Sequence, residues 1–160
     1  DELALTSVDM TQPVTCYGGS DGVAEVDVDA TTGTGPYDYQ WFYDASLSNP
    51  GPGATGSILT GATAGTYYIL VTDANLCFVS GSVLISQPPQ ITGTTAITSP
   101  VSCNGESDAE ITITASGGSG TLQYELNGSG TWLDSNIITG LGASEIFLTS
   151  RLKPSRLDSI

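Results

Sequence analysis

The feature that most constrains the fold of this chain is an internal repeat. The stretch "VTCYGGSDG" at 14–22 returns as "VSCNGESDA" at 101–109, with Cys16 and Cys103 lying 87 positions apart. Two later stretches also match, "GTGPYDYQW" (33–41) with "GSGTLQYEL" (118–126) and "ILTGATAG" (58–65) with "IITGLGAS" (137–144). A repeat of this length is too long for a solenoid unit and predicts two small domains in tandem.

Each repeat has the pattern of β-strands. Residues 25–28 alternate acid and valine, and residues 111–114 alternate isoleucine and threonine, so each strand is predicted to bury one face. The segments 36–43, 65–73 and 77–89 are rich in aromatic and β-branched residues, and the glycine within the last suggests a bulge. No segment has a helical pattern. We therefore predict an all-β fold of tandem immunoglobulin-like antiparallel β-sandwich modules, the second of them incomplete.

Prolines and charge mark the boundaries. Pro88 and Pro89 end the first repeat, which gives domains at 1–89 and 90–150 joined by a short, stiff connection. All three basic residues lie in the last ten positions, Arg151, Lys153 and Arg156, so 151–160 is predicted to be an atypical basic tail.

The charge of the chain excludes some partners. Seventeen acids against three bases give a net charge of −14, which repels nucleic acid and anionic lipid. No apolar run is long enough to cross a bilayer, so membrane insertion is not expected. The acids fit either the solubility of a secreted protein or the attraction of a divalent cation. The acidic N-terminus lacks an export signal, so we expect a mature or internal fragment or a signal outside these residues.

Taken in order, the motifs resemble the SprB repeat family of Bacteroidota cell-surface proteins. The stretches that carry the resemblance are "VTCYGGSDG" (14–22), "GTGPYDYQW" (33–41), "AGTYYILVTDANLC" (64–77) and "VLISQPP" (83–89). The chain departs from the family at Leu76, where a glycine is usual. The resemblance implies an immunoglobulin-like or PKD-like sandwich, an extracellular location, and a place among tandem repeats of large secreted adhesins, including those of gliding motility.

The second repeat follows this pattern only to about Gly142. Beyond it stands "ASEIFLTSRLKPSRL" (143–157), in which the last strands and the second cysteine of the pattern are missing. We expect a shifted reading frame or truncated gene near residue 144; the alternative is a divergent terminal repeat.

The odd number of cysteines follows from the repeat. Cys16 and Cys77 bracket the first repeat, and Cys103 is the counterpart of Cys16 in a repeat that has lost its second cysteine. We predict a Cys16–Cys77 disulfide between the first and last strands, with Cys103 as an unpaired thiol. The alternative is free, buried thiols in a reducing compartment.

Catalysis has little support in the sequence. The chain has no histidine, which excludes a Ser-His-Asp or Cys-His arrangement and leaves three cysteines as a poor zinc set. The acids Glu25, Asp27 and Asp29 are placed by their spacing on the solvent face of a strand rather than across a cleft. We therefore expect no enzyme.

Two sets of residues are candidates for binding a ligand. Asp21, Asp73 and Asn75 offer oxygen ligands for calcium, although "SDG" and "DAN" are equally good turn sequences. Tyr37, Tyr39, Trp41 and Tyr43 alternate along one strand and would stack on sugar rings if exposed, although Trp41 also suits the core of a sandwich.

The expected function is a non-catalytic segment of a secreted surface adhesin that spaces or presents binding regions, with neighbouring repeats as its partners. The alternatives are a glycan-binding module for surface polysaccharide and an accessory domain of a secreted hydrolase. The resemblance supplies the adhesin interpretation; strand periodicity and charge do not.

Overall fold

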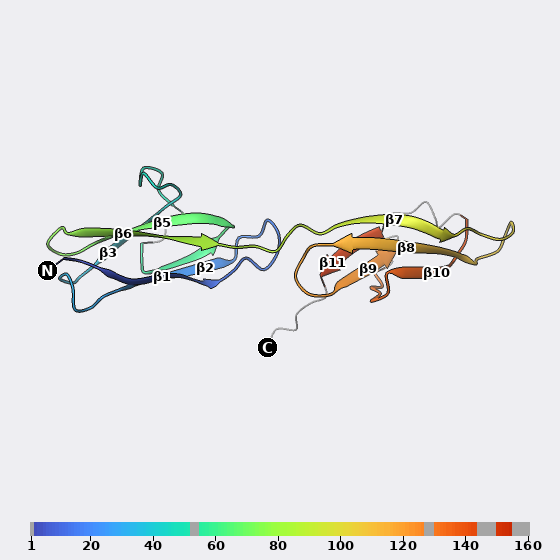
Figure 1. Cartoon of the computed structure of the whole chain (residues 1–160), viewed down its shortest axis with the longest axis horizontal. Coiled ribbons are helices and arrows are strands. Elements are labelled where there is room, and N and C mark those ends of the chain that lie inside the picture. Colours follow the sequence, from blue (N-terminus) through green and yellow to red (C-terminus); the bar gives the residue numbers. More distant parts are fainter. Residues whose placement is uncertain (1, 52–54, 127–129, 144–149, 155–160) are drawn as a thin grey trace. The chain divides into compact units, whose positions relative to one another are not determined.

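The computed structural model describes residues 2–51, 55–126, 130–143 and 150–154, the last five by their backbone alone (Figure 1). By its internal contacts the chain divides into unit 1, Asp1–Pro88, and unit 2, Pro89–Ile160. Every regular element in the described ranges is a strand. Those ranges contain no helix of the length and apolarity needed to cross a membrane.

Unit 1 is a sandwich of two antiparallel sheets. Its strands are β1 (Leu5–Gln12), β2 (Gly22–Val28), β3 (Asp38–Phe42), β4 (Ile58–Ala62), β5 (Gly65–Thr72) and β6 (Phe78–Ile85). The sheets have the orders β1-β2-β4 and β3-β5-β6. If the six strands are lettered A, B, C, E, F and G, these orders are the ABE and CFG sheets of an immunoglobulin sandwich that lacks strand D. The predicted fold class is confirmed.

The core of unit 1 fills the space between its sheets. Alternate residues point inward, as in β5, where Tyr67, Ile69 and Val71 are buried while the residues between them are half-exposed. Trp41 is 2% exposed, and its Nε1 donates a hydrogen bond of 3.0 Å to the carbonyl of Gly56. The buried residues of this core are Leu3, Val14, Ala24, Val26, Trp41, Leu59, Ala62, Tyr67, Ile69, Val71, Val83 and Ile85.

Unit 2 repeats this arrangement with fewer strands. They are β7 (Thr92–Ser99), β8 (Ala109–Ser116), β9 (Leu122–Leu126), β10 (Ile137–Leu141) and β11 (Ser150–Pro154). The sheets are β10-β8-β7 and β11-β9, so β7 to β11 correspond to β1 to β5. Among the residues whose side chains are described, its buried core residues are Ala109, Ile111, Ile113, Ile138 and Leu141.

The end of unit 2 corrects one expectation from the sequence. Residues at the start of the basic tail form β11, which pairs antiparallel with β9 as β5 pairs with β3. Of the missing last strands, only the counterpart of β6 has no equivalent among the described residues. The predicted frame change near residue 144 lies outside the described residues.

The glycine in β6, Gly81, does not form the predicted bulge. Strands β5 and β6 pair without interruption from Gly65–Ile85 to Thr72–Phe78, so Gly81 is not a bulge. A Cβ at this position would lie 2.7 Å from Cγ2 of Val8 and 3.0 Å from Cδ1 of Leu5. Gly81 is required because β1 packs directly over the backbone of β6.

Candidate functional site

The repeated motif forms the connection between β1 and β2. The carboxylate of Asp21 accepts hydrogen bonds from the hydroxyl of Thr15 (2.6 Å) and its backbone N–H (3.0 Å). These two bonds hold the pKa of Asp21 below its ordinary value, and the bond from the Thr15 hydroxyl has the larger effect. The backbone N–H of Gly19 donates to the carbonyl of Cys16, and Gly18 has a φ of +75°, which explains its glycine.

The same loop geometry recurs between β7 and β8. The N–H of Ser102 donates to Asp108 at 3.0 Å, the N–H of Glu106 donates to the carbonyl of Cys103, and Gly105 has a φ of +94°. The hydrogen bonds from Ser102 lower the pKa of Asp108. The motif recurs in the sequence because both units need this loop, and the roles of its residues are structural.

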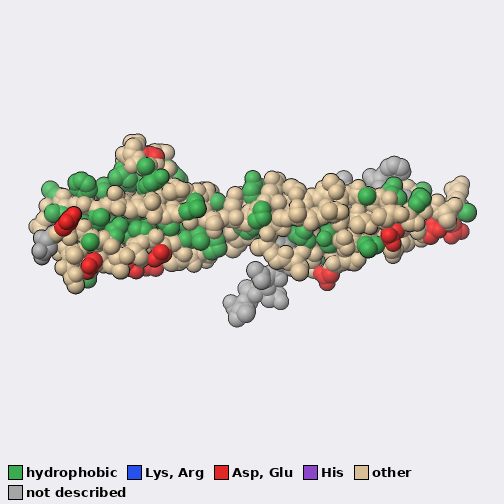
Figure 2. Space-filling view, viewed as in Figure 1, with side chains coloured by type: hydrophobic (Ala, Val, Ile, Leu, Met, Phe, Trp, Pro, Cys, Tyr) green, Lys and Arg blue, Asp and Glu red, His purple; other side chains and the backbone are tan. Residues whose placement is uncertain are grey.

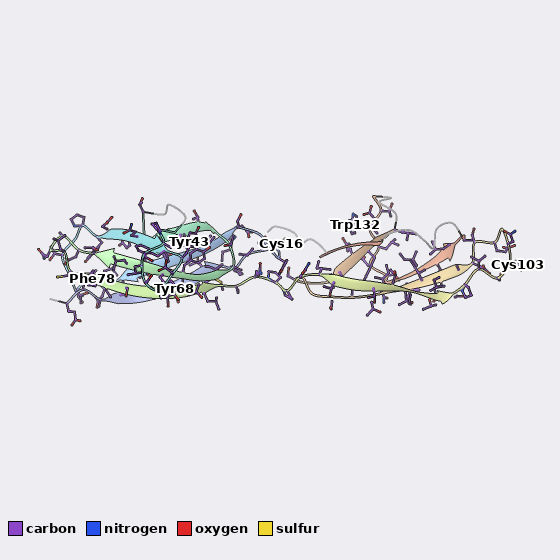
Figure 3. The ribbon with its side chains drawn as sticks, turned by 90° about the horizontal axis from the view of Figure 1, so that it is seen from above. Cys16, Tyr43, Tyr68, Phe78, Cys103 and Trp132 are labelled. Atoms are coloured by element: carbon purple, nitrogen blue, oxygen red, sulfur yellow. The ribbon has the colours of Figure 1, made fainter. Side chains whose placement is uncertain are left out.

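In unit 1 this loop also holds the end of β6. The N–H of Val14 donates to the carbonyl of Ser86 at 2.9 Å, and the N–H of Gly18 donates to the side-chain oxygen of Gln87 at 2.8 Å. The motif therefore lies at the end of unit 1 from which the chain leaves, as Cys16 shows in Figure 3.

Asp73 organises the other end of unit 1. The residue is 4% exposed, and its carboxylate accepts hydrogen bonds from three backbone N–H groups, those of Cys77 (2.9 Å), Thr34 (3.0 Å) and Asn75 (2.8 Å). Burial raises the pKa of Asp73, but the three N–H groups together outweigh burial, so the pKa lies below its ordinary value.

The three predicted calcium ligands do not form one site. Asp73 and Asn75 are neighbours in the loop that follows β5, whereas Asp21 precedes β2, whose first residue, Gly22, pairs with Ala62 close to the start of β5. The eight residues of β5 separate the two places by about 26 Å. Both carboxylates already accept hydrogen bonds from backbone N–H groups of their own loops, which is the turn chemistry predicted as the alternative. The described residues contain no cluster of three acidic or cysteine side chains suited to a metal ion.

The predicted Cys16–Cys77 disulfide is wrong for this structure. Both cysteines are free and exposed, and so is Cys103. Cys77 immediately precedes β6, whereas Cys16 lies beyond the other end of that strand, at opposite ends of unit 1 as Cys16 and Phe78 mark in Figure 3. A strand of eight residues spans about 26 Å, far more than the Cα separation of about 7 Å that a disulfide tolerates. The thiols are not buried either, so the predicted alternative also fails in that respect.

The predicted aromatic stripe does not form an exposed platform. Trp41 is in the core, and Tyr37 and Tyr39 are half-buried against it. Burial, together with nearby Tyr37 and Asp27, raises the pKa of Tyr39. Tyr43 is 47% exposed, and its ring lies 5.6 Å from that of Tyr67 at a tilt of 47°. Three of the four rings are thus used for packing.

The acids on β2 lie along one sheet, as their spacing predicts. Glu25 pairs with Asp9 and Asp27 with Ser7 across the β1–β2 ladder. In the view of Figure 2, acidic side chains lie along the β1–β2 side of unit 1. Asp29 follows the strand, and its carboxylate accepts hydrogen bonds from the backbone N–H and the hydroxyl of Thr31. Both bonds lower the pKa of Asp29, and the bond from the hydroxyl has the larger effect.

One structural acid was missed by the sequence analysis. Asp44 accepts hydrogen bonds from the hydroxyl of Ser46 (2.5 Å) and the backbone N–H groups of Ser48 and Asn49. The Ser46 hydroxyl is the main cause of the lowered pKa of Asp44. The available signal was an aspartate followed by serines and an asparagine, which is typical of an Asx turn.

Comparison with known proteins supports the family predicted from the motifs. The SprB repeat family matches residues 9–42 and 95–131, which lie in unit 1 and unit 2 respectively. These two matches confirm the resemblance to SprB repeats and support a repeat domain of a cell-surface protein. No curated protein matches the chain.

Several solved structures are similar at low identity. Three N-terminal domains of the bacteriophage RB49 Highly Immunogenic Outer Capsid protein are 18% identical with a TM-score of 0.46, covering 94% of this chain and 57% of theirs. Murine CEACAM1b is 14% identical with a TM-score of 0.34, covering 94% and 92%. The fibronectin(III)-like modules of Clostridium thermocellum CbhA are 16% identical with a TM-score of 0.34, covering 94% and 80%.

Proposed function

We propose that these SprB repeats act as a non-catalytic spacer in a secreted adhesin, where they hold binding regions away from the cell surface. The proposal depends mainly on where the chain enters and leaves unit 1. A spacer lengthens a chain most efficiently when each repeat receives the chain at one end and releases it at the other.

The entry point of unit 1 lies beside the Asp73 loop. Leu3, which precedes β1, is buried there. Gly33 lies beside both Leu3 and Asp73: a Cβ on Gly33 would be 2.7 Å from Cδ1 of Leu3 and 3.4 Å from the carboxylate of Asp73. The exit point lies at the opposite end, where Ser86 and Gln87 are held by the loop of the repeated motif. One unit therefore carries the chain along the full length of β6, about 26 Å.

The acids of the loops also support a structural role. Asp21, Asp73 and Asp108 each accept hydrogen bonds from their own connections. Such bonds fix the loops at both ends of unit 1 and at the corresponding loop of unit 2. The adhesive role itself is inferred from the family resemblance.

Two measurements test the proposal. Spin labels on the native Cys16 and Cys77, in a Cys103→Ser background, should report a distance between the labels of at least about 26 Å by pulsed electron resonance. The intact chain should show no saturable binding to neutral or acidic polysaccharides, with calcium or with chelator. A short label distance would remove the spacer geometry, and calcium-dependent or Tyr43-dependent glycan binding would favour the recognition module instead.

A further inference from the structure

Strand β7 is an open edge of unit 2. It lies at the end of the sheet β10-β8-β7 and pairs only with β8 in the described part of the chain. All eight of its residues are exposed. In an antiparallel ladder every second residue of an edge strand directs its N–H and C=O groups away from its one neighbour, so β7 offers a row of groups ready to pair.

The corresponding strand of unit 1 is protected. The register of β1 against β2 shifts twice, between Leu5 and Ser7 and between Met10 and Gln12. It carries the exposed acid Asp9, and its residues Leu5 and Val8 pack over Gly81 of β6. Bulges, a charge and a covering strand are the devices by which proteins prevent pairing at a sheet edge.

In the described part of the chain, strand β7 has no charge and no covering strand of the β6 type, and its ladder has a single register shift. Its ladder with β8 is continuous from Thr92 to Ile97 and shifts only before Ser99. Its sequence, TGTTAITS, has no charge and no proline, and Ala96 stands where β1 has Asp9.

We propose that β7 pairs antiparallel with β7 of a second copy, about a twofold axis, so that two unit 2 sheets become one continuous sheet. Two chains of charge −14 repel each other over most of their surface, and an uncharged edge is where they can approach. Threonine and isoleucine are favourable in cross-strand pairs, and backbone hydrogen bonds supply the rest. The result goes beyond spacing: it joins neighbouring chains side by side.

The sequence of β7 also argues against packing of a strand over β7 in the way that β6 packs against β1. In unit 1 the contacts with β6 come from Leu5 and Val8, whose counterparts in unit 2 are Thr92 and Thr95. These threonines remove the apolar surface on which such a cover depends. Pairing in the plane of the sheet does not need that surface.

The test is the oligomeric state of the intact chain. Sedimentation velocity in reducing buffer at about 0.15 M salt should show a dimer that grows with concentration up to about 1 mM. Ala96→Asp installs the acid that β1 has at this place and should weaken the dimer at least tenfold, because the two aspartates would meet near the axis. Thr66→Asp adds the same charge to an exposed position on β5 of unit 1 and should leave the dimer intact.

Hydrogen exchange on the unmodified chain gives a second readout that does not depend on any variant folding. Amides of 92–99 should become protected as concentration rises. A monomer at every concentration, a dimer unaffected by Ala96→Asp, or equal loss in both variants would each overturn the proposal. So would binding of a free peptide of the β6 sequence to β7 of a chain that stays monomeric, since that would assign the edge to another occupant.

Discussion

Leu76 has a strained backbone conformation, and its exposed side chain gains no burial in return. It has a φ of +66° in the turn before β6, and its side chain is 81% exposed. A leucine in this left-handed conformation costs about 1–2 kcal/mol, and no apolar burial offsets the cost. Glycine, which the family resemblance leads one to expect here, would remove it.

We therefore expect Leu76→Gly to stabilise unit 1 by up to about 1 kcal/mol, part of the gain being lost to the entropy of glycine in the unfolded chain. The measurement is the urea midpoint followed by tryptophan fluorescence. Leu76→Ala is the matched control, because it shortens the side chain but keeps the strain. An equal gain from both variants would show that backbone strain is not the cause.

Asp73 gives a prediction on pH. Its folded pKa is below its ordinary value, so it stabilises unit 1 above about pH 5 and loses this effect as pH falls through about 3.9 toward the folded pKa. Asp73→Asn should lower the Tm at pH 7 by at least about 5 °C, because an amide nitrogen cannot accept the N–H groups now bound.

The pH comparison checks the sign of this effect. The difference in Tm between Asp73→Asn and the unmodified chain should shrink from pH 7 to pH 3. Asp38→Asn, at an exposed position on β3, should change Tm little at either pH. A difference that stays constant or grows in acid would contradict the assignment.

What the sequence predicted at this scale was the residue type, not its partners. Asp21 and Asp73 were recognisable as turn residues, since "SDG" and "DAN" are typical turn sequences. Thr34, whose backbone N–H donates a hydrogen bond to Asp73, is 39 positions away in the sequence, and only the packed sandwich brings the two together. The cysteine pairing failed for the same reason: bracketing a domain in sequence does not place two residues at the same end of it.

Elements pack through close backbone approach as well as through apolar side chains. At Gly81 the two outer strands β1 and β6 come so near that a methyl group would meet Val8 and Leu5 at 3.0 Å or less. A sequence pattern shows only that a glycine lies within a strand, and this fits a bulge as well as it fits the close approach of another strand. The distinction depends on a strand some 70 positions away in the chain, which the periodicity of β6 does not encode.

Gly81→Ala should therefore destabilise unit 1 by about 1–3 kcal/mol, because β1 or β6 must shift to make room. The measurement is the midpoint of urea unfolding with circular dichroism to confirm the fold. Gly56→Ala is the matched control, since a Cβ there meets nothing within 4 Å and should be neutral or slightly stabilising. Equal losses from both would mean that the glycine effect is general and that the contact with β1 is not tight.

At the scale of the whole molecule, the repeat in the sequence predicted two domains of the same fold, because a recurring order of turns and apolar alternation forces a recurring order of strands. Their relative stability did not follow from the repeat. Among the residues whose side chains are described, unit 1 has twelve buried residues in its core, including Trp41 and Tyr67, whereas unit 2 has five, none of them aromatic. The described part of unit 2 also has no counterpart of β6, which contributes Val83 and Ile85 to the core of unit 1.

Hydrophobic burial is the main stabilising contribution to folding, so we expect the two units to unfold in separate transitions, with unit 2 at least about 10 °C below unit 1. Trp132→Phe leaves Trp41 as the single tryptophan, so its fluorescence should follow unit 1 alone. Circular dichroism of the same variant should show an earlier loss of strand signal as unit 2 unfolds. If fluorescence and circular dichroism changed together in one transition, the smaller core of unit 2 would not be its weakness, and the two units would have to be treated as one cooperative structure.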